Sequence, residues 1–444
     1  MKRILAILCA LAVFAGCSED RSQVLKVYNW STYIDESVID DFEQWYEEQT
    51  GDPIHVIYQT FDILETMLSK IEKGHEDYDV VCPSDYIIER MLQNDLLLPL
   101  DMDLGDTPDY TGNVSPFIKT YFNDIRGDGR NANDYAVGYM WGTTGILYNT
   151  KYVTEEEATT WEVLRNPKFT DKIFVKDSPR DVCSQIIIHL HQKELEEGTV
   201  TMDELMLDSS EETLAAVEAF MKDVKQYVAG WEADFGKEQM TKERGWINLN
   251  WSGDSMWAVE EAAEMGVDLK FVCPKEGFTI FFDGWVIPKY AGNPKAANYW
   301  IDYMCRTDIA LRNSMETGYV SCVCGDEILE AYENEDLEPL DASYFFGPGA
   351  EAVRLDPAWY PDKADIAHSA MEHDWGDDTH LLIELWSRVK GDNANLSTII
   401  VISVTLVALL VLGIMRKVKK ARRRYGSRGS RKYRACTGYL MPKK

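Results

Sequence analysis

Short apolar runs that alternate with helical patterns limit the folds open to this chain more than any other feature. Runs suited to β-strands cover residues 24–28, 54–58 and 79–83. Helical patterns follow each of them, over residues 38–48, 63–72 and 86–94. This βαβα order predicts an α/β fold with parallel sheets covered by helices. Roughly 370 residues of such units exceed what one hydrophobic core usually holds, so we expect two lobes.

Single residues predict where some helices begin and end. Gly51 is expected to end the helix over residues 38–48, because glycine readily takes the left-handed conformation found there. Farther along, Ser209 with Glu212 has the spacing of a capping box and predicts a helix start. Gly230 is the predicted end of that helix.

The N-terminus has the pattern of an export signal. Lys2 and Arg3 precede an apolar run over residues 4–14, and small residues then lead to Cys17. Residues 1–16 are therefore predicted to be a signal peptide. The arrangement resembles a bacterial lipoprotein signal, in which Cys17 would be lipidated; ordinary cleavage nearby is the alternative.

The C-terminus has the pattern of a membrane anchor. Residues 396–415 contain no charged side chain, and as a helix they would span about 30 Å, enough to cross a bilayer. Residues 416–444 then carry thirteen Lys and Arg and no acid, which predicts a cytoplasmic tail. Residues 385–395 are expected to be a spacer. The bulk of the chain is thus expected outside the cytoplasm, on the periplasmic or outer face of the cell membrane.

The charge of the intervening segment excludes one class of partner. Residues 17–415 carry all 75 acids and only 30 of the 45 bases. Nucleic-acid binding through a basic face is therefore excluded, since phosphates need the opposite sign. The excess of acid weakly favours a cationic partner, although solubility alone would also explain it.

Motifs of enzymes and of metal sites are missing from the sequence. It contains no phosphate-binding G-x-x-x-x-G-K-[ST], no G-x-S-x-G and no H-E-x-x-H. We therefore expect no enzymatic activity, no cofactor and no metal. Six cysteines lie between residues 82 and 324 and could pair in any of 15 ways. Cys82 and Cys273 lie in apolar runs, so we expect mostly free thiols.

Five loop-like segments carry a carboxylate or a hydroxyl, and four of them also carry an aromatic residue. Most of them follow an apolar run, and they cover residues 29–33, 83–86, 177–181, 251–254 and 281–283. Ligands of open α/β sheets bind at the carboxyl ends of strands, so these segments are expected to meet in one crevice. Each alone is a weak signal, because aromatic residues at strand ends more often belong to the core.

In order and spacing, these segments resemble the spermidine/putrescine-binding proteins of bacterial ABC transporters. The likeness covers nearly all of residues 24–391 and rests on V-Y-N-W-S-T-Y, Y-D-V-V-C-P-S-D-Y, N-D-Y-A-V-G-Y-M-W-G-T-T-G-I-L-Y-N, W-S-G-D and P-K-E-G-F-T-I-F-F-D-G-W-V-I-P. It implies a two-lobed, type II periplasmic-binding-protein fold with ligand clamped between the lobes. Residues 24–140 and 279–327 would form lobe 1, and residues 141–278 and 328–391 would form lobe 2.

The resemblance also implies a set of ligand-binding residues. The aromatic walls would be Trp30, Tyr33, Tyr86, Trp251 and Phe281. The amine-binding carboxylates would be Asp181, Asp254 and Asp283, with Ser31 and Ser84 as hydroxyl contacts. Glu372 falls near a position often occupied by glutamine. The family usually has an acid just before the tyrosine of its N-W-[ST]-x-Y motif, and Thr32 stands there instead.

A polyamine suits this residue set on physical grounds. Burying four methylenes against aromatic rings is worth about 3 kcal/mol, and an ammonium over a ring adds roughly 0.5–2 kcal/mol. A sugar is the competing ligand, but sugar sites normally mix amides and bases with their acids, and this set is almost purely anionic. We therefore expect a receptor that delivers putrescine and/or spermidine to an ABC permease and its ATPase. A membrane-anchored polyamine sensor, a receptor for another organic cation and a hydrolase are the alternatives.

Overall fold

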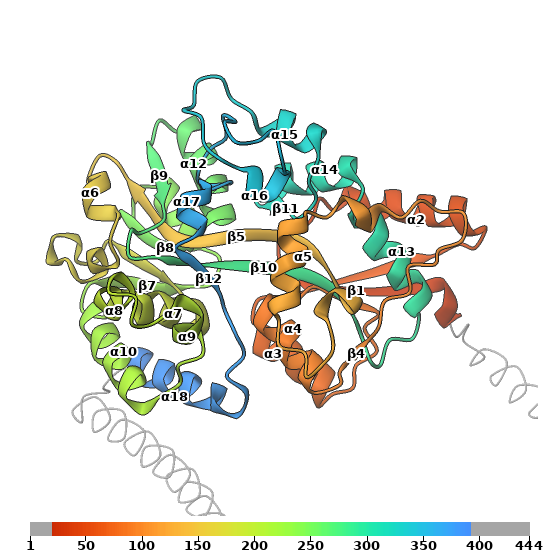
Figure 1. The fold of residues 1–444 in the computed structure, drawn as a ribbon, viewed down its shortest axis with the longest axis horizontal. Helices are drawn as coiled ribbons and strands as arrows, with labels where there is room; N and C mark the ends of the chain where they lie inside the picture. Colours follow the sequence, from red (N-terminus) through yellow and green to blue (C-terminus); the bar gives the residue numbers. More distant parts are fainter. Residues whose placement is uncertain (1–19, 392–444) are drawn as a thin grey trace, which may run out of the picture. The chain divides into compact units, whose positions relative to one another are not determined.

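A twelve-stranded mixed sheet runs through the part of the chain that the computed structural model describes, residues 20–391 (Figure 1). Its strands are β1 (Val24–Trp30), β2 (His55–Phe61), β3 (Val80–Val81), β4 (Leu97–Leu98), β5 (Ala136–Asn149), β6 (Ile173–Lys176), β7 (Val228–Glu232), β8 (Ile247–Trp251), β9 (Leu269–Val272), β10 (Phe278–Pro288), β11 (Val320–Ser321) and β12 (Ser369–Met371). The main path is β2-β1-β3-β10-β5-β8-β6-β7. β4 and β12 pair with β10, and β9 and β11 pair with β5.

The strands fall into two parallel groups joined by antiparallel strands. β1 pairs in parallel with β2 and with β3, and these three strands are called the first strand group. β6 pairs in parallel with β7 and β8, the second strand group. The parallel pairing predicted from the βαβα order is therefore confirmed within each group, because a helical crossover returns the chain in the same direction.

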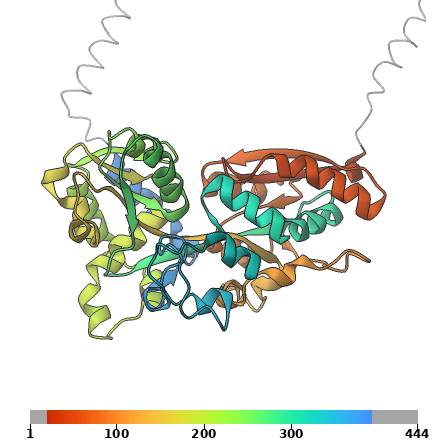
Figure 2. The same ribbon diagram turned by 90° about the horizontal axis from the view of Figure 1, so that it is seen from above.

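Strands β5 and β10 connect the two groups in both views (Figure 1, Figure 2). β5 pairs antiparallel with β10 over residues 136–143 and with β8 over residues 144–148. Every residue of β5 is buried, as expected for a strand covered on both faces. The change of partner, between residues 143 and 144, lies close to residue 140, where the resemblance places the boundary between lobe 1 and lobe 2. The lobe boundaries themselves stay a prediction.

Helices cover the sheet. They are α2 (Ser37–Thr50), α3 (Leu64–Glu72), α4 (Asp85–Gln93), α5 (Pro116–Asp124), α6 (Glu155–Ala158), α7 (Pro179–Leu190), α8 (Gln192–Glu196), α9 (Met202–Met206), α10 (Glu211–Val224), α11 (Gly236–Thr241), α12 (Ser252–Glu264), α13 (Pro294–Met304), α14 (Thr307–Thr317), α15 (Asp326–Tyr332), α16 (Ser343–Phe346), α17 (Lys363–Ile366) and α18 (Thr379–Lys390). Beside the first strand group, α2 and α13 pack through aromatic rings. The Phe42 and Trp300 ring centres lie 5.0 Å apart, and those of Trp45 and Tyr303 lie 4.9 Å apart.

One of the predicted helix boundaries is confirmed and two are wrong. Gly51 ends α2 in the left-handed conformation with φ 75°, as predicted. The capping prediction at Ser209 is wrong by one residue, because the Ser210 side chain accepts from the Thr213 amide and begins α10. Gly230 does not end that helix either: α10 stops at Val224, and Gly230 lies inside β7.

The predicted signal peptide (1–16), Cys17, the predicted membrane helix (396–415) and the basic tail (416–444) lie outside the described residues. Between residues 20 and 391, no helix is both long and apolar enough to span a bilayer. Of the described residues, those from 20 to Trp386 belong to one compact unit. The cysteines of the described part are all free thiols, as predicted: Cys82, Cys183, Cys273, Cys305, Cys322 and Cys324.

Candidate functional site

Trp30, Ser31 and Tyr33 stand at the end of β1 and in the turn that follows it. Thr32, in the same turn, has a φ of 52°, a left-handed conformation that β-branched residues rarely adopt. Such backbone strain persists only where the surroundings fix it, and it is frequent at ligand sites. Ser31 donates a hydrogen bond to the exposed Asp62 at 2.6 Å, whereas Tyr33 is buried.

Asp283 is the carboxylate that this turn reaches. It lies on β10 where the pairing with β5 shifts register, between Asp283 and Gly284, and such a bulge re-aims a side chain. Its two oxygens accept hydrogen bonds from the Tyr33 and Ser84 hydroxyls, each at 2.6 Å. Burial raises the pKa of Asp283 to about 6, although these bonds oppose the rise. Both donors are neutral hydroxyls, so no cation within the described residues is hydrogen-bonded to this carboxylate.

Aromatic rings connect the two strand groups. The ring centres of Trp30 and Trp251 lie 6.3 Å apart, and those of Trp251 and Phe281 lie 6.4 Å apart. Tyr319 continues the series, 6.3 Å from Phe281 and 4.8 Å from Tyr33. The sequence-based search missed Tyr319 because it looked for aromatics that follow strands, and Tyr319 directly precedes β11.

A second group of acids surrounds Asp181, at the start of α7. Asp181 accepts hydrogen bonds from the Ser178 hydroxyl and, at 3.3 Å, from the indole Nε1 of Trp251. Glu372, just after β12, is buried, and its Oε1 has no hydrogen-bond partner within the described residues. Burial and the nearby Asp181 raise the pKa of Glu372 to about 8. Burial raises the pKa of the Tyr86 hydroxyl, and the charges of Glu65 and Asp181 add to the rise.

Bases lie beside these acids, and the sequence did not predict them. The guanidinium of Arg180 stands over the Trp375 ring, 4.5 Å from its centre, and lowers the pKa of Glu372 against the stronger effect of burial. Lys176 Nζ lies 2.6 Å from one oxygen of Asp254, and Lys237 Nζ lies 3.2 Å from the other. Burial alone would raise the pKa of Asp254, but the two lysines outweigh it and the pKa is lowered.

The structure therefore brings most of the predicted site residues together. Their acids differ in one respect, which is whether lysines neutralise them. Asp283, Asp181 and Glu372 are buried acids with raised pKa values. Asp254 is a buried acid already neutralised by lysines. Aromatic rings beside buried carboxylates that form no ion pair within the described residues can hold an organic cation. Between residues 20 and 391, no group of three or more His, Cys, Asp or Glu side chains is arranged to hold a metal ion.

The family follows from the sequence match. The family model described as bacterial extracellular solute-binding protein matches residues 38–324, more than half of the chain. The chain belongs to this family.

Relatives of this solute-binding protein are named for polyamines. The spermidine/putrescine-binding periplasmic protein of Salmonella typhimurium is 25% identical over 384 residues, which cover 86% of this chain and 95% of the relative. The putrescine-binding periplasmic protein PotF of Escherichia coli is 27% identical over 368 residues, covering 80% of this chain and 88% of PotF.

The fold of this solute-binding protein is that of solved relatives. The spermidine/putrescine ABC transporter substrate-binding protein PotD of Streptococcus pneumoniae superposes with a TM-score of 0.60 and 26% identity, covering 83% of this chain and 100% of PotD. The structure is thus an α/β periplasmic-binding-protein fold with a mixed sheet, as the resemblance implied.

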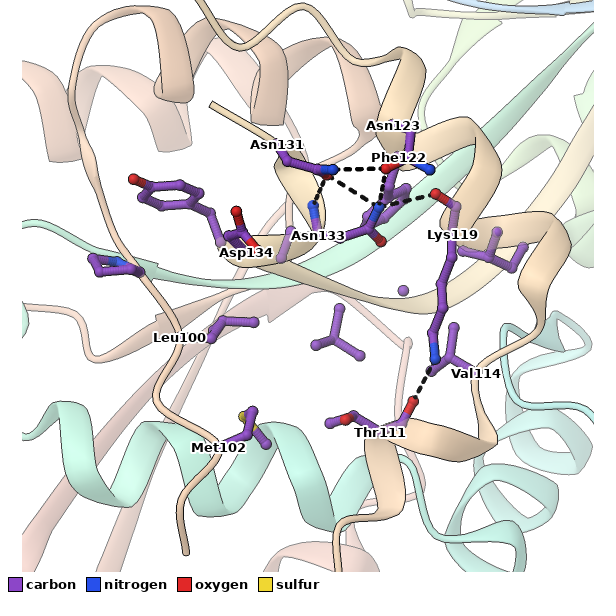
Figure 3. Close-up of a pocket in the computed structure, with 16 residues that line it drawn as sticks. Leu100, Met102, Thr111, Val114, Lys119, Phe122, Asn123, Asn131, Asn133 and Asp134 are labelled. Atoms are coloured by element: carbon purple, nitrogen blue, oxygen red, sulfur yellow. Dashed lines mark hydrogen bonds between the residues drawn. The ribbon is translucent and has the colours of Figure 1, made fainter. Parts of the chain in front are cut away.

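A pocket of about 720 Å³ in this solute-binding protein is lined by none of the predicted ligand residues (Figure 3). Leu100, Met102 and Val114 form apolar lining. On the opposite side Asn131 donates to Asn123 at 2.8 Å, within a hydrogen-bonded cluster of asparagines (Figure 3). The charged residues of the lining are one base and one acid, Lys119 and Asp134, so the pocket lacks the excess of buried acids found around Asp283 and Asp181.

Gly253, within the W-S-G-D segment, allows Tyr319 to pack against α12. A Cβ at Gly253 would lie 2.2 Å from Cγ of the Tyr319 ring. Gly253→Ala is therefore expected to lower the free energy of unfolding by about 1–3 kcal/mol, the usual cost of overpacking, and to displace Tyr319 from Phe281. Urea denaturation measures the loss. Gly112→Ala is the matched control, because no atom lies within 4 Å of its new Cβ; equal stability of the two variants would contradict the expectation.

Proposed function

We propose that this protein is an extracytoplasmic receptor that captures a polyamine, putrescine and/or spermidine, and delivers it to an ABC importer. The observation that carries the proposal is Asp283, a buried carboxylate whose hydrogen bonds come from the Tyr33 and Ser84 hydroxyls. Removing a charge from water without a counter-charge is costly. A ligand ammonium beside Asp283 supplies that counter-charge.

The rings around Asp283 suit the rest of such a ligand. Trp30 and Trp251 come from different strand groups, and Phe281 lies on β10, which connects them. A methylene chain between these rings is removed from water along its length. The relatives from Salmonella typhimurium and Escherichia coli, which are named as spermidine/putrescine- and putrescine-binding proteins, support the same ligand class.

Capture would also give the importer a signal that it can recognise. In this proposal Trp30, Tyr33, Ser84 and Asp283 belong to lobe 1, whereas Asp181 and Trp251 belong to lobe 2. A ligand that contacts both lobes favours their closed arrangement, and the permease would bind that form. Deletion of this protein is expected to abolish uptake of labelled putrescine or spermidine by the cells that produce it. Normal uptake with altered gene expression would favour the sensor alternative instead.

We also propose that the protein is held at the cell membrane by the predicted lipid on Cys17 and the predicted helix over residues 396–415. The proposal rests on the sequence of these segments and on the charge of residues 416–444. The full chain is expected to stay with membranes after an alkaline carbonate wash. Its release into the supernatant would contradict the anchor.

Calorimetry of the purified full chain tests the ligand class. Putrescine, spermidine, an N-acylated diamine and neutral hexoses form the panel. Binding of at least one amine and of no hexose is expected. Binding of a hexose without binding of any amine would contradict the amine receptor and would indicate a sugar receptor.

Amine binding is expected to strengthen as the pH rises from about 5 to 8. The ligand stays cationic in this range, while Asp283 with a pKa of about 6 and Glu372 with a pKa of about 8 lose their protons. A bound ammonium favours the ionised carboxylates, so binding releases protons at pH 7. Calorimetry in two buffers of different ionisation enthalpy measures that release. Proton uptake, or an affinity that does not change with pH, would contradict the role of these carboxyls.

The empty protein should respond to pH in the opposite direction. A carboxyl whose folded pKa lies above its unfolded value contributes stability that is present below the unfolded pKa and is lost as pH rises through the folded pKa. For Asp283 and Glu372 this loss covers about pH 4 to 8. The stabilisation that a ligand provides should therefore grow across the same window.

A further inference from the structure

Lys176 places an ammonium group of the protein itself against the Trp251 ring. It is the last residue of β6, and its side chain is fully buried. Its Nζ lies 2.6 Å from Oδ2 of Asp254 and 4.2 Å from the centre of the Trp251 ring. A carboxylate and an aromatic face are the partners that the proposed function gives to a ligand ammonium.

Asp254 has both oxygens engaged. Lys237 Nζ lies 3.2 Å from Oδ1, opposite the oxygen that Lys176 contacts. Lys176 is held further by a hydrogen bond of 3.1 Å to the Ala233 carbonyl and by Glu232 at 3.4 Å. Another ammonium at this carboxylate would meet two like charges in a site with little water to screen them.

These contacts belong to the second strand group and the helices beside it. Lys176 ends β6, Glu232 ends β7, Lys237 lies on α11, and Asp254 lies in the first turn of α12. β6 pairs directly with both β7 and β8. The Lys176 contact therefore forms within one side of the protein and does not depend on an approach of the first strand group.

Three other buried acids near the rings, Asp283, Asp181 and Glu372, form no ion pair within residues 20–391. Asp283 accepts from two hydroxyls, and Asp181 accepts from a hydroxyl and an indole. Oε1 of the buried Glu372 has no hydrogen-bond partner within the described residues. Arg180 donates from Nη2 to the Met206 carbonyl at 2.6 Å, not to an acid. Arg180 lowers the pKa of Asp181 and of Glu372 against the effect of burial but forms an ion pair with neither, whereas Asp254 forms ion pairs with two lysines.

Resting on the receptor function above and narrowing its ligand from putrescine or spermidine to a mono-acylated derivative, we propose that Lys176 acts as a built-in second ammonium and that the ligand is an amine with one ammonium and an uncharged far end. The ligand ammonium would lie at Asp283, whose donors are the Tyr33 and Ser84 hydroxyls, and the far end would approach Trp251 and Lys176. A diamine with a neutral amide at one end belongs to this class. A carboxylate end does not, because both lysines already have acid partners, Asp254 and Glu232 for Lys176 and Asp254 and Asp234 for Lys237.

Calorimetry with two ligands of equal chain length tests this assignment on the unaltered full chain. The ligands are 1,4-diaminobutane and N-acetyl-1,4-diaminobutane. The acetylated amine is expected to bind at least about tenfold more tightly, which corresponds to 1.4 kcal/mol. A preference for the free diamine, or equal affinity, overturns the inference and leaves the amine receptor standing. Failure of both ligands and of spermidine would instead contradict the receptor function itself.

Lys176→Met then shows whether this lysine causes the preference. The variant removes the built-in ammonium and keeps an apolar stem, so the ratio of the two affinities is expected to reverse in favour of the diamine. Lys172→Met is the matched control, because Lys172 also stands over a tryptophan, Trp246, with Nζ 5.2 Å from the ring centre, outside the cluster. An unchanged ratio in folded Lys176→Met, judged by its circular dichroism, would overturn the role of Lys176.

Discussion

Asp283→Asn is expected to weaken amine binding by about 100-fold or more. The wild-type carboxylate is buried and receives hydrogen bonds from two hydroxyls, so the ligand ammonium provides its counter-charge. Truncating one partner of a buried charge pair typically costs about 2–5 kcal/mol. The asparagine keeps the size of the side chain and can still accept from Tyr33 or Ser84. Calorimetry at pH 7.5, above the pKa of about 6 of Asp283, measures the loss.

Asp302→Asn is the matched control for this variant. Asp302 is also a fully buried acid whose pKa is raised to about 6, mainly by burial, and it accepts from the Tyr110 amide at 2.6 Å. It lies on α13, away from the ring series. Asp302→Asn is expected to keep the wild-type affinity even where it alters stability. An equal loss of affinity in both variants would show that Asp283 acts through the fold and not through the ligand.

Asp254→Asn is expected to lower the free energy of unfolding by about 3 kcal/mol, the lower end of the cost of breaking a buried ion pair. The change leaves the Lys176 ammonium buried with Glu232 at 3.4 Å as its remaining acid, and leaves Lys237 with Asp234 at 2.8 Å. Those remaining partners are the reason for choosing the lower figure. Urea denaturation at pH 7.5 measures the loss.

The double variant Asp254→Asn with Lys176→Met completes the cycle for this pair. With the buried ammonium removed as well, most of the lost stability is expected to return, because an apolar side chain needs no counter-charge. Additive losses in the double variant would mean that the 2.6 Å contact between Lys176 and Asp254 contributes no coupling energy. The same protein samples serve for the comparison of 1,4-diaminobutane with N-acetyl-1,4-diaminobutane.

The sequence predicted the parallel parts of the fold better than the rest. Alternating strand and helix patterns are local, so β1, β2 and β3 and the helices between them could be predicted from short windows. The antiparallel direction of β5 and β10 could not, because the partners of each strand lie far away in the chain. Gly230 shows the same limit: it was predicted as a helix stop, whereas pairing with Phe174 places it in a strand.

The candidate site divides in a similar way. Asp283 and Trp251 could be predicted because each belongs to a motif with a recognisable neighbour sequence. Lys176 could not, since a lysine at the end of an apolar run normally reaches solvent, and its partner Asp254 is brought to it only by the pairing of β6 with β8. Tyr319 was missed because it precedes its strand. Contacts between distant segments, not local pattern, decide these positions.

The shared strand β5 has a consequence for how the chain matures. Its antiparallel partner β10 is synthesised long after it, and β8 and β9 also follow it. Until those segments emerge, a nascent chain would carry β5 with unpaired edges, which are prone to wrong association. Pairing of such distant segments is intrinsically slow. The native sheet is therefore completed only after β10, which lies far along the chain, has paired with β5.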